Sequence, residues 1–395
     1  MESNSAAVKQ NKRINKQTVI VSLGKKFRRL FLSDPLLWCS LLLAVGSAFV
    51  VPPNAAYLHY LDMRTLAMLF SLMLVVAGFK QTGVFAWLAG KLLAFAHTTR
   101  SLSAVMIGVC FFGSMLITND IALLTFVPFT IMLLAETGNS RLMIPLIVLQ
   151  TISANLGSSL TPLGNPQNLY IYSLSGMSPG SFLQTMVLPV GISLLLLAVS
   201  LLFIKNQPLH TKSCGEVCID KKQVLLWVGL FGLCLLAVLR LIHYALAFGI
   251  IVAAVLCCHR TMFAKVDYSL LLTFVFLFIF TGNLGNLPEV SRMAGSFLQG
   301  HEFAAGVLLS QFISNVPAAM LLSGFTDNYP SLLLGVNIGG LGTLIASMAS
   351  LISYKMYSHC SGASHSRYLL VFTALNLLFL VILCLFVYLS GVQVL

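Results

Sequence analysis

Two short polar runs interrupt long apolar stretches of this chain, and they carry the groups best suited to chemistry. The first is Thr118-Asn119-Asp120 and the second is Ser314-Asn315-Val316-Pro317. Hydroxyl and amide side chains donate and accept hydrogen bonds without a charge, so they suit the reversible binding of an ion. Asp120 is the only carboxylate inside an apolar stretch at these positions. The pattern indicates binding, because it lacks the paired acids, His–Asp pair or Ser–base pair that catalysis would need.

Two longer polar segments are related to each other by position. They align without gaps at an offset of 182 residues, which is the distance from Asn155 to Asn337. Asn, Pro and Thr are uncommon filler in apolar segments, so the match predicts an internal repeat. The aligned positions are Asn155-Leu156-Gly157 on Asn337-Ile338-Gly339, Thr161 on Thr343, Leu163-Gly164-Asn165 on Ile345-Ala346-Ser347, and, for the two short runs, Thr118-Asn119 on Ser314-Asn315.

Each interruption has the pattern of a helix start. Thr161-Pro162 combines a capping residue with proline at the first helical position, and the run at 314–317 follows the same order. A helix N-terminus presents free N–H groups and about half a positive charge. Four such ends would supply about two positive charges without any Lys or Arg. The pattern predicts an anion site, with side-chain oxygens and unwound carbonyls left to hold a coupling Na⁺.

Asp120 has two interpretations. An ionised acid at the centre of a membrane span costs at least about 2.5–3.5 kcal/mol, which favours a role as a proton-coupling or cation-binding group. The alternative is that Asp120 only caps the helix that follows it, where the helix dipole stabilises a negative charge. The two roles are compatible, and the functional role is our prediction.

The elements that position these residues are predicted to be membrane helices. Of the 395 residues, 58% are hydrophobic and 9% are charged, whereas a soluble domain averages about 25% charged residues. This composition excludes a soluble enzyme and a nucleic-acid-binding protein. A spanning helix needs about 20 mainly apolar residues. Uninterrupted candidate spans lie near 36–51, 64–79, 182–204, 223–240, 243–258, 268–282 and 366–391.

Four further apolar segments are interrupted. Residues 142–172 and 331–354 are long enough to cross a bilayer but carry Gly, Asn, Pro and Thr in their middles, so we expect two helices broken at the midplane. Residues 101–135 and 303–325 each hold two apolar arms around a polar tip. Each arm is expected to be too short to cross, which predicts two re-entrant hairpins. The predicted fold class is an all-α polytopic membrane protein with about nine transmembrane helices plus two re-entrant hairpins in an inverted-topology repeat.

The basic residues give an independent test of this topology. With the N-terminus in the cytoplasm, nine spans place 20 of the 23 Lys and Arg residues inside and leave Arg64, Arg240 and Arg292 outside. The net charge of +12 therefore indicates orientation in a cytoplasmic (inner) membrane. The predicted order is a basic cytoplasmic tail (1–33), a first repeat (34–204), a cytoplasmic linker (205–222) and a second repeat (223–395) with its C-terminus outside.

Three residues have metal-ligand spacing. His210, Cys214 and Cys218 lie in a polar loop, but a fourth ligand is missing, so we interpret them as solvated residues. No metal centre and no cofactor is predicted, apart from Na⁺ or H⁺ as a transient coupling ion.

At the polar runs the sequence resembles an ion transporter superfamily. This superfamily includes citrate transporter-like permeases, divalent anion:sodium symporters, arsenite permeases and certain sodium:proton antiporters. The resemblance covers almost all of the chain after Phe31 and is most specific at 118–120, 155–166, 314–315 and 337–340. It implies an elevator-type secondary transporter that forms a homodimer.

The branches of this superfamily differ at the hairpin tips. In the dicarboxylate branch each tip reads Ser-Asn-Thr, so Asn119 and Asn315 match and the third positions do not. Asp120 is similar to the arsenite and antiporter branches, whereas Gly164-Asn165-Pro166 is similar to the citrate transporter-like branch. A simple sodium:dicarboxylate assignment therefore does not follow from the resemblance.

Together these features predict a secondary active transporter, not an enzyme, that moves a carboxylate or inorganic oxyanion coupled to Na⁺ or H⁺. A sodium:proton antiporter that uses Asp120 is the nearest alternative, and an anion channel is a third. The predicted partners are a small anion and the lipid bilayer, and no nucleic acid. The predicted substrate-binding residues are Asn119, Asn155, Ser158, Thr161, Gly164, Asn165, Ser314, Asn315, Asn337, Gly339 and Thr343. The predicted ion-coupling residues are Thr118, Asn119, Asp120, Asn315 and Ser347.

Overall fold

The computed structural model describes residues 35–55, 57–93, 96–208, 220–360 and 362–391. These residues are almost entirely helical, and the one β-bridge among them joins Thr98 to Pro208. The predicted all-α class is confirmed. The basic tail at 1–33 and the group His210, Cys214 and Cys218 lie outside the described residues.

The described helices fall into two groups along the chain, before residue 209 and after residue 219. The first part contains α2 (Pro35–Val50), α3 (Tyr57–Tyr60), α4 (Met63–Thr82), α5 (Val84–Leu93), α6 (Thr99–Ile117), α7 (Asn119–Glu136), η1 (Ser140–Leu142), α8 (Met143–Ser158), α9 (Pro166–Ser175) and α10 (Pro179–Leu202). The second part contains α11 (Lys221–Val238), α12 (Tyr244–Cys258), η2 (Arg260–Lys265), α13 (Tyr268–Gly285), α14 (Pro288–Leu298), α15 (Glu302–Ile313), α16 (Asn315–Ser323), α17 (Tyr329–Ile338), α18 (Met348–Ser358) and α19 (His365–Ser390).

Seven of the described helices are long and apolar enough to cross a membrane: α4, α6, α7, α10, α11, α13 and α19. Five of these were predicted as uninterrupted spans, whereas the predicted spans at α2 and α12 form helices of 16 and 15 residues. The expectation that both arms of the first hairpin are too short to cross is wrong. Its arms α6 and α7 have 19 and 18 residues, because the polar tip is a single residue between two long apolar runs. The arms of the second hairpin, α15 and α16, have 12 and 9 residues.

Two predicted helices are broken as expected. The first is interrupted between α8 and α9 and the second between α17 and α18. The predicted helix start at Thr161-Pro162 is wrong by a few residues, because α9 begins at Pro166. The side-chain Oδ1 of Asn165 accepts a hydrogen bond from the Asn168 backbone N–H at 3.0 Å, so the Asn-Pro pair supplies the cap and the first helical position. At the second hairpin, α16 begins at Asn315 and Ser314 makes no capping hydrogen bond.

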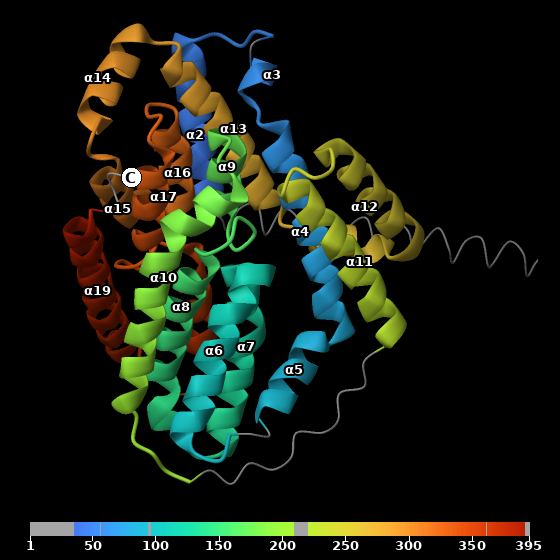
Figure 1. The fold of residues 1–395 in the computed structure, drawn as a ribbon, viewed down its shortest axis with the longest axis vertical. Coiled ribbons are helices and arrows are strands. Elements are labelled where there is room, and N and C mark those ends of the chain that lie inside the picture. Colours follow the sequence, from blue (N-terminus) through green and yellow to red (C-terminus); the bar gives the residue numbers. More distant parts are fainter. Residues whose placement is uncertain (1–34, 56, 94–95, 209–219, 361, 392–395) are drawn as a thin grey trace, which may run out of the picture.

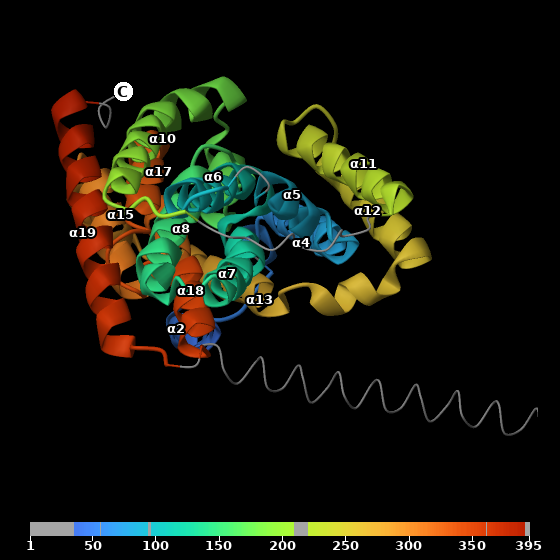
Figure 2. The same ribbon diagram turned by 90° about the horizontal axis from the view of Figure 1, so that it is seen from below.

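The two hairpins lie at opposite ends of the molecule. Figure 1 shows α6, α7 and α8 in the lower half and α15, α16 and α17 in the upper half. The packing repeats between the halves: α6 and α7 pack on α8 as α15 and α16 pack on α17, and α18 packs on α7 as α9 packs on α16. Figure 2 shows α19 at one edge, and α11 and α12, which pack against α4, at the other.

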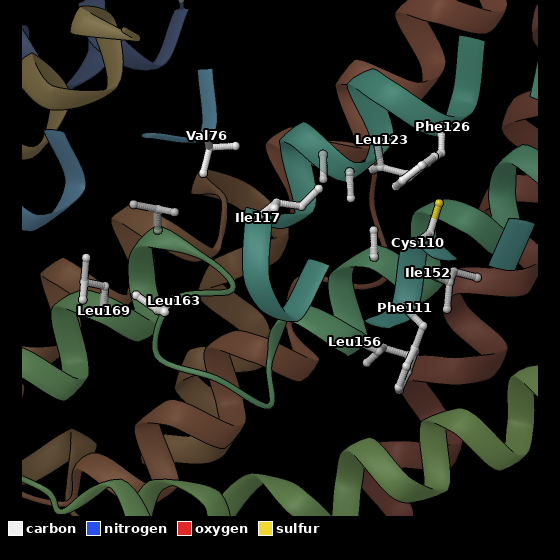
Figure 3. Close-up of a cluster of buried hydrophobic side chains, with 14 of the residues drawn as sticks. Val76, Cys110, Phe111, Ile117, Leu123, Phe126, Ile152, Leu156, Leu163 and Leu169 are labelled. Carbon is white, nitrogen blue, oxygen red and sulfur yellow. The ribbon is translucent and has the colours of Figure 1, made fainter. Parts of the chain in front are cut away.

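A buried apolar cluster includes both arms of the first hairpin. Figure 3 shows side chains from α6, α7 and α8 meeting others from α4 and from the segment around the first helix break. Phe111 on α6 and Phe126 on α7 are each 1% exposed. The backbone of α6 also passes so close to α8 that a Cβ at Gly157 would overlap the Phe111 carbonyl. This packing fixes the end of α6, and with it the tip that follows. The other labelled members are Val76, Cys110, Ile117, Leu123, Ile152, Leu156, Leu163 and Leu169.

Candidate substrate and ion site

The tip residues of the two hairpins share an unusual backbone conformation. Thr118 has φ 70° and ψ 149°, and Ser314 has φ 74° and ψ 154°. This region of backbone space is essentially restricted to glycine and costs about 1–3 kcal/mol for other residues. Such a cost persists only when the surrounding structure imposes the conformation. The tips of the two hairpins therefore share one backbone geometry.

Each tip is held by the break of the neighbouring helix. The backbone N–H of Asn119 donates to the Gly164 carbonyl at 3.1 Å, and that of Asn315 donates to the Ala346 carbonyl at 3.0 Å. Gly164 and Ala346 are partners in the 182-residue alignment. Gly164 has a further constraint, because a Cβ there would overlap the Ser158 carbonyl. The loop between α8 and α9 can therefore fold this tightly only with glycine at that position.

The two broken helices are joined by reciprocal hydrogen bonds. Asn165 Nδ2 donates to Asn337 Oδ1 at 3.1 Å, and Ser347 Oγ donates to Asn155 Oδ1 at 3.0 Å. Asn165 aligns with Ser347, and Asn155 aligns with Asn337. In each case the residue that begins the second half of one broken helix binds the asparagine near the end of the first half of the other.

A second reciprocal pair lies beside the first. Asn337 Nδ2 donates to Asn168 Oδ1 at 2.6 Å, and Asn155 Nδ2 donates to Ser350 Oγ at 3.5 Å. Asn168 and Ser350 are again aligned positions. Asn155 Oδ1 also accepts from Asn119 Nδ2 at 3.0 Å, which connects the first tip to this network. Every side chain in the network is buried, so the network is rigid as well as polar.

A small pocket lies where the tips and the second halves of the broken helices meet. It is lined by the first residues of α7, α9, α16 and α18, together with Leu270 of α13. Four helix N-termini therefore surround it, each with free N–H groups and a partial positive charge. Lys and Arg are absent from its lining. The lining residues are Asn119, Asp120, Pro166, Gln167, Leu270, Asn315, Val316, Ser347 and Met348.

Asp120 lines this pocket from the first turn of α7 and makes no capping hydrogen bond. Its backbone N–H donates to Asn119 Oδ1 at 2.9 Å, and α7 begins with no side-chain capping hydrogen bond. The Asp120 Oδ1 atom is buried and has no hydrogen-bond partner. The cap interpretation therefore lacks its hydrogen bond, and an acceptor oxygen remains available to whatever enters the pocket.

The predicted site residues divide by position. Asn119, Asp120, Asn315 and Ser347 line the pocket, and Asn155, Ser158, Asn165 and Asn337 form the network behind it. Thr118 and Ser314 occupy the tips. Gly164 and Gly339 lie where another part of the backbone comes too close for a side chain. A Cβ at Gly164 would overlap the Ser158 carbonyl, and one at Gly339 would lie 2.7 Å from the Gly335 carbonyl oxygen.

Two predicted residues lie away from the pocket. Thr161 Oγ1 donates to the Met115 carbonyl at 2.5 Å, which ties the first break to α6. Thr343 is exposed, and its Oγ1 donates to the Gln311 carbonyl at 2.9 Å. Both hydroxyls therefore hold loops in place. Their distance from the pocket follows from the helix starts, which lie five residues later than Thr161 and Thr343 in both repeats.

The sequence analysis missed several residues that the structure brings to the site. Gln167, Val316, Met348 and Leu270 line the pocket, and Asn168 completes the network. Asn168 could have been found from its alignment with Ser350. Gln167 could have been found from its place directly after the Asn165-Pro166 cap, in the first turn of a helix that points at the site.

Comparison with known proteins places the chain in a family. The family model described as citrate transporter matches residues 30–328. Inner membrane protein YbiR of Escherichia coli strain K12 is 33% identical over 343 residues, covering 84% of this chain and 90% of that protein. The uncharacterized transporter MJ0456 of Methanocaldococcus jannaschii is 31% identical over 326 residues, covering 82% of this chain and 89% of that protein.

A third relative matches a shorter region. The silicon efflux transporter LSI3 of Oryza sativa subsp. japonica is 36% identical over 153 residues, which are 38% of this chain and 31% of that protein. The family model and the long alignments agree with the helices long enough to span a membrane. The chain is therefore a multi-pass membrane transporter that belongs to the citrate transporter family.

Proposed function

We propose that the protein is a secondary active transporter that moves a small anion, a carboxylate or an inorganic oxyanion, coupled to Na⁺ or H⁺. One observation carries the proposal: four helix N-termini from two matched halves of the chain surround one pocket that also holds an acid. Helix N-termini attract anions without fixed basic side chains. The acid and the unwound carbonyls of the breaks are suited to a cation or a proton.

The two halves form an inverted-topology repeat in this proposal. The equal backbone angles of Thr118 and Ser314 support it, as do the reciprocal hydrogen bonds between the broken helices. The hairpins enter from opposite faces of the membrane, and their tips meet at its midplane. Such a site can open to either side by movement of one part of the molecule against the other.

The moving part comprises the two hairpins and the two broken helices. Their packing on one another supports this division, since α18 packs on α7 and α8 while α9 packs on α16 and α17. In an elevator-type mechanism this body carries the pocket across the membrane, and the remaining helices form a stationary scaffold that dimerises. The name of the Escherichia coli relative and the distribution of basic residues support the inner membrane, with the N-terminus in the cytoplasm and the C-terminus outside.

Asp120 is the coupling group in this proposal. Its carboxylate can bind Na⁺ or take up a proton through its other oxygen when the anion binds, which leaves the buried, unpartnered Oδ1 to the anion, and it releases that cation on the other side. The position that matches Asp120 in the second hairpin is Val316. Coupling is therefore confined to one side of the pocket.

The same acid supports a second candidate, a sodium:proton antiporter in which no anion binds. Uptake and pH measurements in proteoliposomes separate the two. The transporter predicts saturable anion uptake that stops when the Na⁺ and H⁺ gradients are collapsed. Dissipation of a pH gradient on addition of Na⁺, with no transportable anion present, would support the antiporter instead. Anion flux that continues without any cation gradient would support a channel.

The Asp120→Asn variant tests the coupling role. It should change the pH or Na⁺ dependence of uptake, because an amide can neither take up a proton nor neutralise Na⁺. Glu302→Gln is a matched control, since Glu302 is also a buried acid but accepts hydrogen bonds from Gly300 N–H and Thr326 Oγ1 outside the pocket. If Asp120→Asn leaves both dependences unchanged, the coupling group lies elsewhere.

A further inference from the structure

The polar groups of the pocket are distributed unequally between the two repeats. In the first repeat the second residue of α7 is Asp120 and the second residue of α9 is Gln167. The matched residues of the second repeat are Val316 and Ala349. One wall of the pocket therefore has an acid and an amide where the matched positions are apolar. An anion attracted by four helix N-termini alone would need no such difference.

Asp120 has an acceptor atom without a hydrogen-bond partner, and Gln167 has a donor atom without one. Among the described residues, seven side-chain atoms are buried without a hydrogen-bond partner. Two of them belong to residues that line the pocket: Asp120 Oδ1, an acceptor, and Gln167 Nε2, a donor. Gln167 is 1% exposed. A buried polar group left unpaired destabilises the protein, so a ligand that pairs both atoms recovers this cost on binding.

We propose that Asp120 and Gln167 together recognise an oxyacid in a form that keeps at least one hydroxyl group. The hydroxyl donates to Asp120 Oδ1, and an oxygen on the same central atom accepts from Gln167 Nε2. A fully deprotonated oxyanion has only acceptor oxygens, and it would place one of them against the carboxylate. This inference rests on the proposed anion transport and specifies which anions the pocket takes.

Apolar side chains form part of the pocket lining. The second-repeat side presents Val316 and Met348, and α13 adds Leu270. These apolar side chains exclude water, which strengthens the two polar contacts.

The test compares ligands of similar shape that differ in the hydroxyl. Binding to the purified full-length protein is measured by calorimetry for hydrogen phosphate and hydrogen selenite, with sulfate as the reference without a hydroxyl. At least one hydroxylated ligand should bind, and sulfate should bind at least about 100-fold more weakly, since sites built to pair a substrate hydroxyl strongly reject analogues that lack it. Equal binding of sulfate, or binding of neither hydroxylated anion, would overturn the inference.

Two variants assign the recognition to its residues. Gln167→Met keeps the size of the side chain and removes the donor, so it should weaken binding of the hydroxylated ligand at least about tenfold. Asp120→Asn should reduce the preference over sulfate, because its amide N–H can donate to a bare oxyanion. Gln150→Met is the matched control: Gln150 is a buried glutamine with an unpartnered Oε1, and it does not line the pocket. It should leave the preference intact.

The outcomes are distinguishable from failure of the proposed function. Cation-coupled uptake of sulfate would keep the transport proposal and overturn this inference. Unchanged binding in Gln167→Met, with normal folding, would also overturn it. If the wild-type protein shows no cation-coupled uptake of any anion, the transport proposal itself is wrong.

Discussion

Asn165 and Asn337 lie 172 residues apart and are joined by a hydrogen bond of 3.1 Å from Asn165 Nδ2 to Asn337 Oδ1. The Nδ2 group of Asn337 also donates to Asn168 Oδ1 at 2.6 Å and to the Leu333 carbonyl at 2.8 Å. Asn337 is 2% exposed, and its amide nitrogen and oxygen both bind groups inside the protein. This one side chain connects the end of α17 to the start of α9 and so holds the two broken helices in register.

Replacement of Asn337 by leucine should therefore destabilise the protein and abolish transport. The substitution leaves donors and acceptors of Asn165 and Asn168 unpaired, at about 1–3 kcal/mol for each buried group. Thermal unfolding in detergent and uptake in proteoliposomes measure the two effects. Asn376→Leu is the control, because Asn376 is equally buried in α19 but donates only to the Phe372 carbonyl of its own helix. Normal uptake in Asn337→Leu would show that the network is not needed for the site.

The hairpin tips should respond to glycine in the opposite way from ordinary helix positions. Thr118→Gly and Ser314→Gly place glycine where the backbone already has a glycine-like conformation, so each should raise stability, by up to about 1 kcal/mol. Thr125→Gly in α7 is the control, and it should lower stability by a similar amount because glycine weakens a helix interior. Thermal unfolding of the three variants checks the sign. A loss of stability in both tip variants would mean that their hydroxyls outweigh the backbone strain.

The positions of the helices could be predicted from the sequence better than their lengths. The broken helices were predicted because Asn, Gly, Pro and Thr stand out against an apolar background. All seven uninterrupted apolar runs likewise form helices where they were expected. The length of the first hairpin was misjudged, since apolar runs on either side of one polar residue merge into helices of 19 and 18 residues. Length in the fold is set by packing on α8 as well as by composition.

The site was predicted in outline and missed in detail. Aligned asparagines pointed to Asn155 and Asn337, but the sequence contains no sign that each binds the opposite repeat. Thr161 and Thr343 were predicted to lie at the site because hydroxyl groups often cap helices. The loops after α8 and α17 instead continue for several residues beyond them before the next helix starts. Gln167 was missed because a glutamine inside an apolar segment has no distinctive pattern, and only its burial without a partner reveals it.

The tight loop at the first break should not tolerate a methyl group. In Gly164→Ala the new Cβ would overlap the Ser158 carbonyl, so the loop must move. Movement would break the bond from the Asn119 N–H to the Gly164 carbonyl and displace the tip from the pocket. Uptake should fall at least about tenfold, equivalent to about 1.4 kcal/mol. Gly191→Ala in α10, where a Cβ meets nothing within 4 Å, should leave uptake unchanged; equal activity of the two variants would contradict the tight-loop argument.

Arg240 links the end of α9 to the connection between α11 and α12. Its guanidinium donates to the Tyr172 carbonyl at 2.9 Å and to the Gly176 carbonyl at 3.0 Å, and it lies 5.0 Å above the Tyr172 ring. A cation at a helix C-terminus is stabilised by the free carbonyls there. Arg240→Ala should cost about 1 kcal/mol of stability, a modest amount because the side chain is exposed.

Arg240→Lys should fall between the wild type and Arg240→Ala, since a point ammonium lacks the planar fork that reaches two carbonyls and stacks on the ring. Arg260→Ala is the control, because Arg260 is exposed and bonds only to the Leu256 carbonyl four residues before it. Thermal unfolding with and without a transported anion measures the series. In the proposed mechanism α9 moves and the α11–α12 connection does not, so removal of Arg240 should also change the uptake rate. Equal unfolding temperatures and equal uptake rates in Arg240→Ala and Arg260→Ala would show that the Arg240 contact contributes neither to stability nor to transport.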